Sequence, residues 1–165
     1  NAKAGKPAHI IAKMNALLEP GIIRALYAAS NAGVTIHLIV RGACALRPGV
    51  PGLSTNIKVR SVIGRFLEHS RIFYFRNNNQ HHVYLSSADW MDRNFFRRIE
   101  ICFPVLDSRL KKRVITEGLK PYLKDNAQAW EMDCNGHYKQ KASHRGKRFC
   151  AQEALLTKLV AAQQS

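Results

Sequence analysis

Strand-like and helix-like hydrophobic patterns alternate at the start of the chain. Residues 8–13 and 34–40 are apolar runs of strand length, and the segment between them carries apolar residues at helical spacing after Glu19-Pro20. Proline fits the first turn of a helix, and a glycine such as Gly33 is typical of its end. The pattern therefore predicts a strand, a helix and a second strand, a unit that is almost always right-handed with parallel strands.

Four more strand-like segments follow, after a loop at 47–56 that is rich in proline and glycine. They are residues 57–62, 72–75, 83–85 and 99–105. The polar residues 76–80 predict a hairpin turn, and Pro104 places the end of the last strand near an edge of the sheet. Together these patterns predict an α/β fold with a mixed β-sheet of about six strands flanked by helices.

Helical patterns dominate from Asp107 onward. Asp107 or Ser108 is a suitable N-cap, an apolar stripe follows at helical spacing, and Pro121 is expected to break or kink the helix. The remaining predictions are one helical turn at 125–130, a basic surface loop at 136–149 and a helix at 151–162 with its leucines on one side. We expect residues 1–165 to form a single domain, because this length is enough for one core.

The charge of the chain changes this picture most. Lysine and arginine number 26 against 11 acidic residues, which gives a formal net charge of +15. Such an excess favours polyanionic partners: nucleic acid, an acidic membrane face, nucleotides or inorganic polyphosphate. Charge does not choose among them, and a basic exterior that only aids solubility is the alternative interpretation.

Targeting and redox signals are sparse. No apolar stretch approaches the ~20 residues needed to span a bilayer, and the start of the chain lacks a signal-peptide pattern. The 4 cysteines form no C-x-x-C pair, which argues against a zinc ribbon. We therefore expect a soluble cytoplasmic protein with reduced thiols, with the inner membrane face as an alternative place. The first residue is not methionine, and we expect the chain to be a piece of a longer protein.

The segment Gly64–Arg71 is the strongest candidate for chemistry, because it sets His69 among charged side chains ahead of an apolar strand. Such a histidine can accept a phosphoryl group or act as a general acid for a departing phosphate oxygen. Arg65 and Arg71 could neutralise charge on a transferring phosphoryl group. The alternatives are a structural histidine and a salt bridge from either arginine to Glu68.

Polar residues also follow other predicted strands. In open α/β sheets ligands gather beyond the carboxyl ends of the strands, and Lys13, Arg41 and the segment Ser86–Asp89 occupy such ends. We expect them to converge on one site. The guanidinium of Arg41 can bind two phosphate oxygens at once, although an exposed arginine after a strand is common. We interpret Asp89 as a helix N-cap and Arg93 as an anion contact.

These motifs resemble a known family. His69-x-Arg71 ahead of a strand, with Ser86–Asp89 after the next one, resembles a half-domain of the phospholipase D superfamily. The closer resemblance is to the C-terminal catalytic domain of the type 1 bacterial polyphosphate kinases. It runs in family order to about Pro104 and more loosely beyond, through Ile11–Asn15, Leu38–Gly42, Leu46–Gly49, Gly64–Arg71 and Ser87–Asn94.

The resemblance implies reversible transfer of the γ-phosphate of ATP onto inorganic polyphosphate, with magnesium. It implies that the Arg41 and His69 positions contact nucleotide, ATP or ADP, and that His69 is a second active-site histidine. The primary phosphohistidine and the magnesium-linked residues of the family belong to a preceding catalytic domain. We therefore expect this chain to be inactive alone, and the full-length enzyme to form a homo-oligomer.

The chain departs from the phospholipase D motif at two positions. The phospholipase D motif places lysine two residues and aspartate seven residues after its histidine, whereas this chain has Arg71 and Arg76. The missing carboxylate argues against phosphodiester cleavage and against DNA as a partner. No glycine-rich phosphate loop is present, which argues against a P-loop kinase. The alternative function is a basic nucleic-acid-binding module without catalysis.

Overall fold

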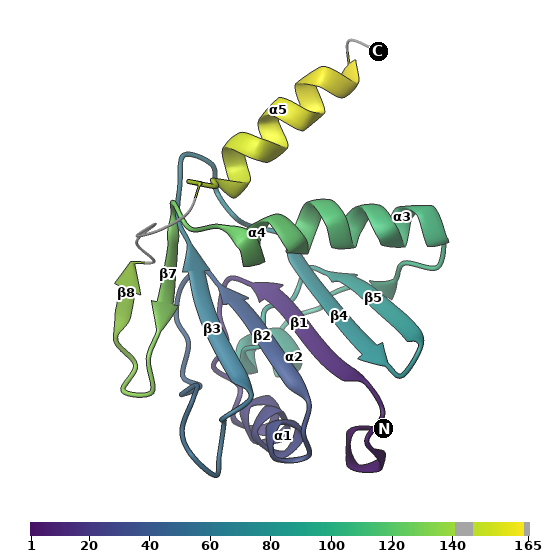
Figure 1. Cartoon of the computed structure of the whole chain (residues 1–165). Coiled ribbons are helices and arrows are strands. Elements are labelled where there is room, and N and C mark those ends of the chain that lie inside the picture. Colours follow the sequence, from purple (N-terminus) through teal and green to yellow (C-terminus); the bar gives the residue numbers. More distant parts are fainter. Residues whose placement is uncertain (141–146, 164–165) are drawn as a thin grey trace.

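The computed structural model describes residues 1–140 and 147–163. Within these ranges, the strands form one mixed 8-stranded sheet in the order β6-β5-β4-β1-β2-β3-β7-β8 (Figure 1). The strands are β1 (Ala8–Met14), β2 (Thr35–Val40), β3 (Ile57–Val62), β4 (Arg71–Asn77), β5 (Gln80–Ser86), β6 (Cys102–Pro104), β7 (Ala129–Met132) and β8 (Tyr138–Gln140). The predicted fold class is confirmed, and the sheet is larger than the expected six strands.

The direction of the strands explains where a site can form. β1 and β3 both run parallel to β2, whereas β4 is antiparallel to β1 and β5 is antiparallel to β4. The carboxyl ends of β1, β2, β3 and β5 therefore lie at the same end of the sheet, which we call its carboxyl edge. β4 begins at this carboxyl edge. The segments predicted to carry chemistry all lie at strand ends on this edge.

Helix α1 (Pro20–Asn31) connects β1 to β2, and the predicted strand–helix–strand unit with parallel strands is confirmed. The side chain of Glu19 caps the helix by accepting hydrogen bonds from the backbone nitrogens of Gly21 (2.9 Å) and Ile22 (2.6 Å). Pro20 occupies the first turn, where its missing N–H costs nothing. Gly33 has a φ of 91°, a left-handed conformation that favours glycine.

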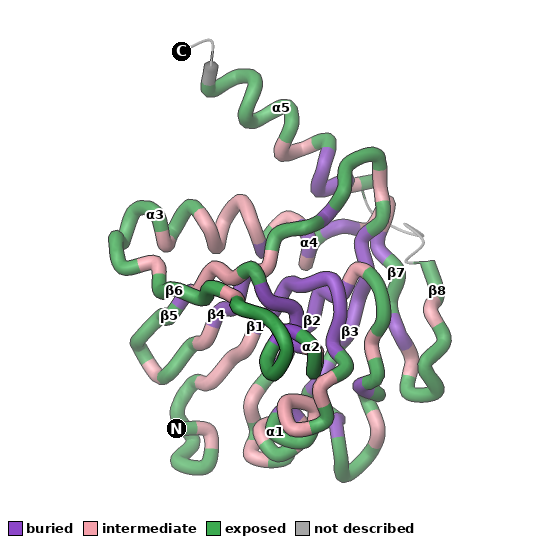
Figure 2. Tube along the Cα trace, turned by 180° about the vertical axis from the view of Figure 1, so that it is seen from behind, coloured by how far each residue is buried: buried purple, intermediate pink, exposed green. Residues whose placement is uncertain are grey.

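The core lies on both faces of the sheet. One cluster packs α1 and Trp90 against the face that carries Met14 and Leu38. The other packs the helical segments at 114–124 and the start of the last helix against the face that carries Ile11 and Ile39. Burial is densest in the central strands β1, β2 and β3 (Figure 2). Each fully buried large aliphatic side chain contributes about 1.5–3 kcal/mol, which makes these strands a rigid support for their carboxyl ends.

The helical stretch after β6 changes type along its length. α3 (Ser108–Arg113) is capped by Asp107 as predicted, then a π-helical segment, η2 (Val114–Leu119), leads into α4 (Lys120–Lys124). Pro121 lies in the first turn of α4, so the expected break takes the form of this change in helix type. Gly118 allows the helix to approach the sheet, because a Cβ there would lie 2.4 Å from Cδ1 of Ile72.

Three local predictions need correction. Residues 125–130 are not a helical turn, since Ala129–Met132 pairs with β3 as β7. Within the predicted loop at 136–149, Tyr138–Gln140 forms β8, and residues 141–146 lie outside the described residues. Of the predicted strand at 99–105, only Cys102–Pro104 forms a strand, the edge strand β6. β7 pairs with the distant strand β3, whereas β6 and β8 each pair with the strand before them in the chain, so that strand pairing rather than local propensity decided the outcome.

The last helix, α5 (Ala151–Gln163), was predicted with nearly the same bounds. Only its first residues are buried, and Leu156, Leu159 and Val160 are exposed. The helix extends away from the sheet (Figure 1). The sequence predicted these apolar residues on one side of the helix, and in the outer part of the helix they remain exposed. None of the helices in the described part of the chain combines the length and apolar character needed to span a bilayer.

Candidate functional site

Polar side chains from three strand ends and one loop are joined by hydrogen bonds at the carboxyl edge of the sheet. Arg41 directly follows β2, and its Nε donates to Oδ1 of Asn15 at 3.0 Å. Asn15 follows β1, and its backbone nitrogen donates to Oδ1 of Asp89 at 2.7 Å. Asp89 lies after β5 and is only 4% exposed. The structure therefore confirms that the ends of β1, β2 and β5 converge, as predicted.

Asp89 continues the chain of contacts to the histidine. Arg71 donates to it through Nε at 3.1 Å and through Nη2 at 3.0 Å, a two-pronged ion pair. Nη1 of Arg71 lies 3.2 Å from Nδ1 of His69 and 3.2 Å from the His69 carbonyl oxygen. The imidazole of His69 is exposed. Arg41 and His69 are thus linked on one edge of the molecule through Asn15, Asp89 and Arg71.

A second buried ion pair lies beside the first group of contacts. Nζ of Lys13 is 2.6 Å from Oε2 of Glu68 and 2.8 Å from Oγ of Ser70, and it lies 3.7 Å above the ring of Tyr122. The side chains of Lys13 and Glu68 are 3% and 10% exposed. Burial lowers the pKa of Lys13 below its usual value, and the Glu68 carboxylate opposes this shift. Both neighbours of His69 in sequence, Glu68 and Ser70, are therefore held by one ammonium group.

We call the seven side chains Lys13, Asn15, Arg41, Glu68, His69, Arg71 and Asp89 the edge network. Its pairing differs from the sequence interpretation. The alternative of a salt bridge from Arg65 or Arg71 to Glu68 is wrong, because Glu68 binds Lys13 and Arg71 binds Asp89. Asp89 is not an N-cap either, since α2 begins at Asp92 after an N-cap at Met91. Its carboxylate turns inward, where it has stronger partners.

Two predicted site residues stand apart from the edge network. Arg65 is exposed, with its guanidinium 5.6 Å from the ring of Phe66. Arg93 is exposed on α2 (Asp92–Phe96). Within residues 1–140 and 147–163, neither guanidinium has a hydrogen bond or ion pair to a protein group. Their predicted contacts with a transferring phosphoryl group or another anion stay predictions.

The serines before Asp89 have structural partners. Oγ of Ser86 donates to the carbonyl of Ile101 at 3.1 Å and accepts from the backbone nitrogen of Ala88 at 3.0 Å. Ser87 bonds to the carboxylate of Glu100 and accepts from the backbone nitrogen of Ile101. These hydroxyl groups tie the segment after α2 to the end of β5. Trp90, predicted as a packing residue, stacks on Phe73 with ring centroids 4.8 Å apart.

The edge network predicts a dependence of stability on pH. Burial alone would raise the pKa of Asp89, but the hydrogen bonds from Arg71 and Asn15 outweigh it and hold the pKa below its usual value. A depressed pKa contributes stability that is present above the unfolded value and is lost as pH falls through the folded value. We expect the free energy of unfolding lost on replacing Asp89 with asparagine to be larger at neutral pH than in acid. Urea denaturation of both proteins at each pH measures it, and an equal loss at both would contradict the prediction.

The site residues do not fit a magnesium ion. The carboxylates of the edge network, Glu68 and Asp89, each bind a cationic side chain already. Over the described ranges, no cluster of three or more histidine, cysteine, aspartate or glutamate side chains is arranged to hold a metal. Mg²⁺ needs oxygen ligands that are free to face it.

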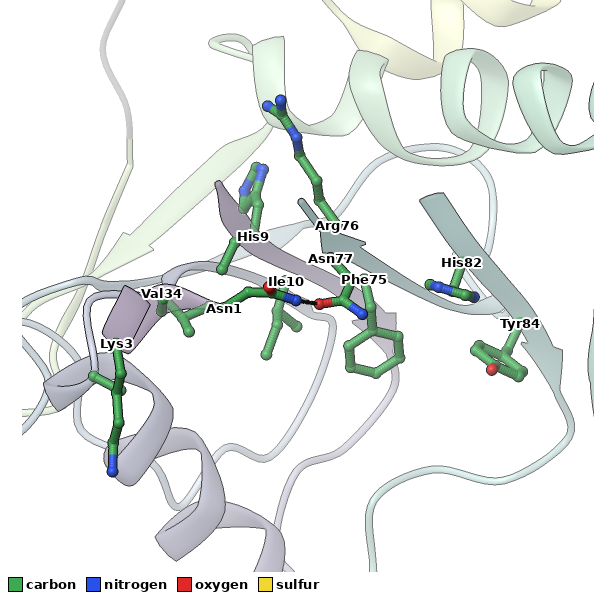
Figure 3. Close-up of a pocket in the computed structure, with 13 residues that line it drawn as sticks. Asn1, Lys3, His9, Ile10, Val34, Phe75, Arg76, Asn77, His82 and Tyr84 are labelled. Carbon is green, nitrogen blue, oxygen red and sulfur yellow. Dashed lines mark hydrogen bonds between the residues drawn. The ribbon is translucent and has the colours of Figure 1, made fainter. Parts of the chain in front are cut away.

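A large hollow of about 730 Å³ lies at the opposite end of the same strands (Figure 3). It is lined by Asn1, Ala8, Phe75, His82 and Tyr84, among others, and by no member of the edge network. Its lining holds no acid and no aligned acid–base pair, so size alone does not make it the site. His81 and His82, interpreted as surface residues, are both exposed.

Sequence reasoning missed the roles of three residues that hold other site residues in place. Asp89 was placed at the site, but its position after a strand equally suits an N-cap. Asn15 and Gln152 were not singled out, and neither has a charge or a spacing that marks it in the sequence. Gln152 lies in the first turn of α5, far along the chain from the residues that it contacts.

Known proteins resemble this chain over nearly all of its length. The family model for the polyphosphate kinase C-terminal domain 2 matches residues 1–152. A polyphosphate kinase of Burkholderia multivorans is 61% identical over 158 residues, and one of Paraburkholderia phytofirmans is 60% identical. These matches cover 96% of this chain and 23% of each relative. The chain therefore spans about a quarter of the length of these relatives.

Solved structures agree. The crystal structure of polyphosphate kinase from Porphyromonas gingivalis superposes with a TM-score of 0.94 and 41% identity, over 99% of this chain and 25% of that one. Nuc from Salmonella typhimurium, a phospholipase D family member, superposes with a TM-score of 0.58 at 14% identity, over 80% of this chain and 86% of that one. The second likeness concerns the fold alone, and it bears out the predicted phospholipase D-like architecture. Nothing in these matches supports a non-catalytic nucleic-acid-binding module.

Proposed function

This chain belongs to the polyphosphate kinase family, and we propose that it forms the nucleotide-binding part of a site that transfers the γ-phosphate of ATP reversibly to inorganic polyphosphate. The observation that carries the proposal is the edge network. An exposed imidazole just before β4 and a guanidinium just after β2, with β1 between these strands, are linked at the same end of the sheet by a chain of hydrogen bonds through Asn15, Asp89 and Arg71. A phosphate tail laid across both would meet a hydrogen-bond donor at each end.

Arg41 would hold the phosphates of the nucleotide. Its Nε is occupied by Asn15, which orients the planar guanidinium. Among the described residues no protein group binds its two Nη nitrogens, so both remain available to a phosphate. Gly42 follows, and a Cβ there would lie 3.1 Å from the carbonyl oxygen of Asn15. This arrangement suits the two-pronged recognition of phosphate for which arginine is preferred over lysine.

His69 would act as a hydrogen-bond donor or general acid. A guanidinium has donors only, so Nδ1 of His69 must accept from Nη1 of Arg71. In the neutral ring the proton then lies on Nε2, the nitrogen that faces away from Arg71. That tautomer can donate to a phosphate oxygen, whereas a phosphoryl acceptor at Nε2 would need the proton elsewhere. The geometry thus favours a hydrogen-bond donor at Nε2 over the secondary phosphohistidine, whereas a general acid would need the doubly protonated ring, whose Nδ1–H would face the Arg71 guanidinium.

The remaining cations would neutralise the charge of ATP and polymer. Arg71 shares its charge with Asp89, so its main role would be to orient His69. Arg65 and Arg93 are exposed and would contribute as mobile counter-charges near the phosphates. The net charge of +15 supports a polyanionic substrate over a neutral one.

The rest of the polypeptide would complete the reaction. The relatives are about four times as long as this chain, which leaves room for another catalytic domain. We propose that the primary phosphohistidine and the ligands of Mg²⁺ lie there, and that this chain alone does not turn over. Magnesium bound to ATP would supply charge neutralisation at the phosphates. Assembly into a homo-oligomer, a cytoplasmic location and contact with the inner membrane face belong to the same proposal.

Replacing Arg41 with alanine tests nucleotide binding. We expect the affinity of the full-length enzyme for ATP to fall by about tenfold to a hundredfold, since a charged hydrogen bond is worth ~1.5–3 kcal/mol. Isothermal titration calorimetry with a non-hydrolysable ATP analogue measures it, and polyphosphate should compete with that analogue. The matched control is Arg24→Ala, which removes an exposed arginine on α1. Unchanged binding by the Arg41 variant, or binding of DNA that ATP does not disturb, would favour the nucleic-acid module.

A further inference from the structure

Gln152 contacts the loop that carries His69 with every polar function of its side chain. Its Oε1 accepts from the backbone nitrogen of Phe66 at 3.0 Å, and its Nε2 donates to the carbonyl oxygen of Phe66 at 2.7 Å and to Oε1 of Glu68 at 2.7 Å. Gln152 lies 86 positions after Phe66 and is only 5% exposed. A buried amide with all of its partners on one segment fixes that segment firmly.

The contact is extended on the other side of Glu68. Oε1 of Glu68 binds Gln152, while Oε2 binds Lys13, whose ammonium also donates to Ser70. His69 is the residue between Glu68 and Ser70. The side chains of both residues that flank the imidazole are therefore bound by the buried ammonium of Lys13, although the imidazole itself is exposed.

The loop approaches Gln152 more closely than most residues would allow. A Cβ on Gly64 would lie 2.5 Å from Oε1 of Gln152 and 2.3 Å from Oε1 of Gln128. Real Cβ atoms do not come so near, so any side chain at this position must displace a carboxamide. Glycine at position 64 thus allows the contact between the loop and α5.

The first residues of α5 are held to the rest of the protein by Asp125. Asp125 is fully buried, and Oδ2 of this residue accepts from the backbone nitrogen of Ala151 at 2.7 Å. Its Oδ1 accepts from the backbone nitrogens of Ala127 at 2.9 Å and Gln128 at 2.7 Å. One carboxylate therefore joins the start of α5 to the segment before β7. The rest of α5 extends away from the sheet (Figure 1), and its first turn carries the buried contacts.

We propose that Gln152 is a positioning residue for His69, and that the first turn of α5 holds the loop 64–70 in the geometry that the transfer step needs. This inference rests on the proposed function, because it concerns the same imidazole. Gln152 touches neither the imidazole nor Arg41; it acts through Phe66 and Glu68. Its loss lets the loop shift, and a shift of about 1 Å at a reacting group can cost a hundredfold in rate.

The test compares three variants of the full-length enzyme. Gln152→Ala removes the carboxamide, Gly64→Ala crowds it together with the carboxamide of Gln128, and Glu153→Gln is the control in the same helical turn. Glu153 forms an exposed ion pair with Arg148 and does not contact the loop. Each variant is assayed for kcat and for KM of ATP in polyphosphate synthesis, and its melting temperature is recorded.

We expect kcat to fall by about tenfold to a hundredfold in Gln152→Ala and in the same direction in Gly64→Ala, with KM of ATP changed much less. The control should match the parent enzyme. A residue that only stabilises the fold would lower the melting temperature and leave kcat per folded molecule unchanged, and that result overturns the proposal. If Gln152→Ala does not fold, Gly64→Ala decides by the same criterion.

Hydrogen exchange separates this inference from the proposed function. In Gln152→Ala the backbone amide of Phe66 loses its acceptor, so exchange should accelerate within residues 64–70 and nowhere else in the sheet. Unchanged protection there would overturn the positioning role whatever the assay shows. A parent enzyme that makes no polyphosphate would refute the proposed function, while faster exchange in the loop would still establish the contact between α5 and the loop.

Discussion

Replacing His69 with alanine in the full-length enzyme is expected to lower polyphosphate synthesis by ~10²–10⁴-fold, the range of general acid–base catalysis. The imidazole is exposed at the carboxyl edge of the sheet and is oriented by Arg71 through Nδ1. Its removal leaves the buried contacts of Glu68 and Ser70 intact, so the fold should survive. Rates of polymer synthesis from ATP, at matched melting temperatures, measure the effect.

A matched control is His82→Ala, which removes an exposed imidazole at the far end of β5, beside the hollow of Figure 3. It should leave synthesis unchanged. Labelling with ATP that carries a radioactive γ-phosphate, followed by peptide mapping, separates the two roles of His69. The tautomer set by Arg71 predicts that no label appears on His69. Normal synthesis by the His69 variant would refute both roles.

Replacing Asp89 with alanine is expected to cost about 3–5 kcal/mol of unfolding free energy, the usual penalty for breaking a buried ion pair from one side. The side chains of Arg71 and Asp89 are 14% and 6% exposed, so the guanidinium would lose its partner in a largely dry environment. The backbone nitrogen of Asn15 would also lose its acceptor. Urea denaturation followed by circular dichroism measures the loss.

The comparison for this variant is Asp92→Ala. Asp92 pairs with Arg97 at 3.4 Å, but the two side chains are 61% and 78% exposed. Exposed ion pairs contribute little, so the denaturation midpoint should hardly move. If both aspartate variants shift the denaturation midpoint equally, the buried ion pair of Asp89 does not stabilise the fold more than an exposed one does. Asp89→Ala should also impair nucleotide binding, because Asn15 would no longer be held beside Arg41.

Elements with strong local signals were predicted well. The helix Pro20–Asn31 has its cap at Glu19 and its proline in the first turn, and both signals lie within a few residues of the feature they determine. Likewise, the hairpin of β4 and β5 follows from a polar turn between two apolar runs. By contrast, β7 is a short strand that pairs with β3, far earlier in the chain, and β8 pairs with β7 as a hairpin. The pairing of β7 with β3 leaves no local signal, which is why 125–130 was misassigned, whereas the Asn135-Gly136 turn between β7 and β8 is a local hairpin signal that was overlooked.

The sequence by itself determined the family, the order of strands and helices around the first parallel unit, and the arrival of Arg41 and His69 at strand ends. These follow from local patterns and from the rule that parallel strands end on the same edge. Only the tertiary structure decided which charge meets which. Glu68 binds Lys13 across 55 positions and Gln152 across 84, and Asp89 binds Arg71 across 18. A buried charged side chain binds the oppositely charged or polar group that the fold places within about 3 Å of it. The packing of the sheet and helices decides which group that is, and no single segment of the sequence does.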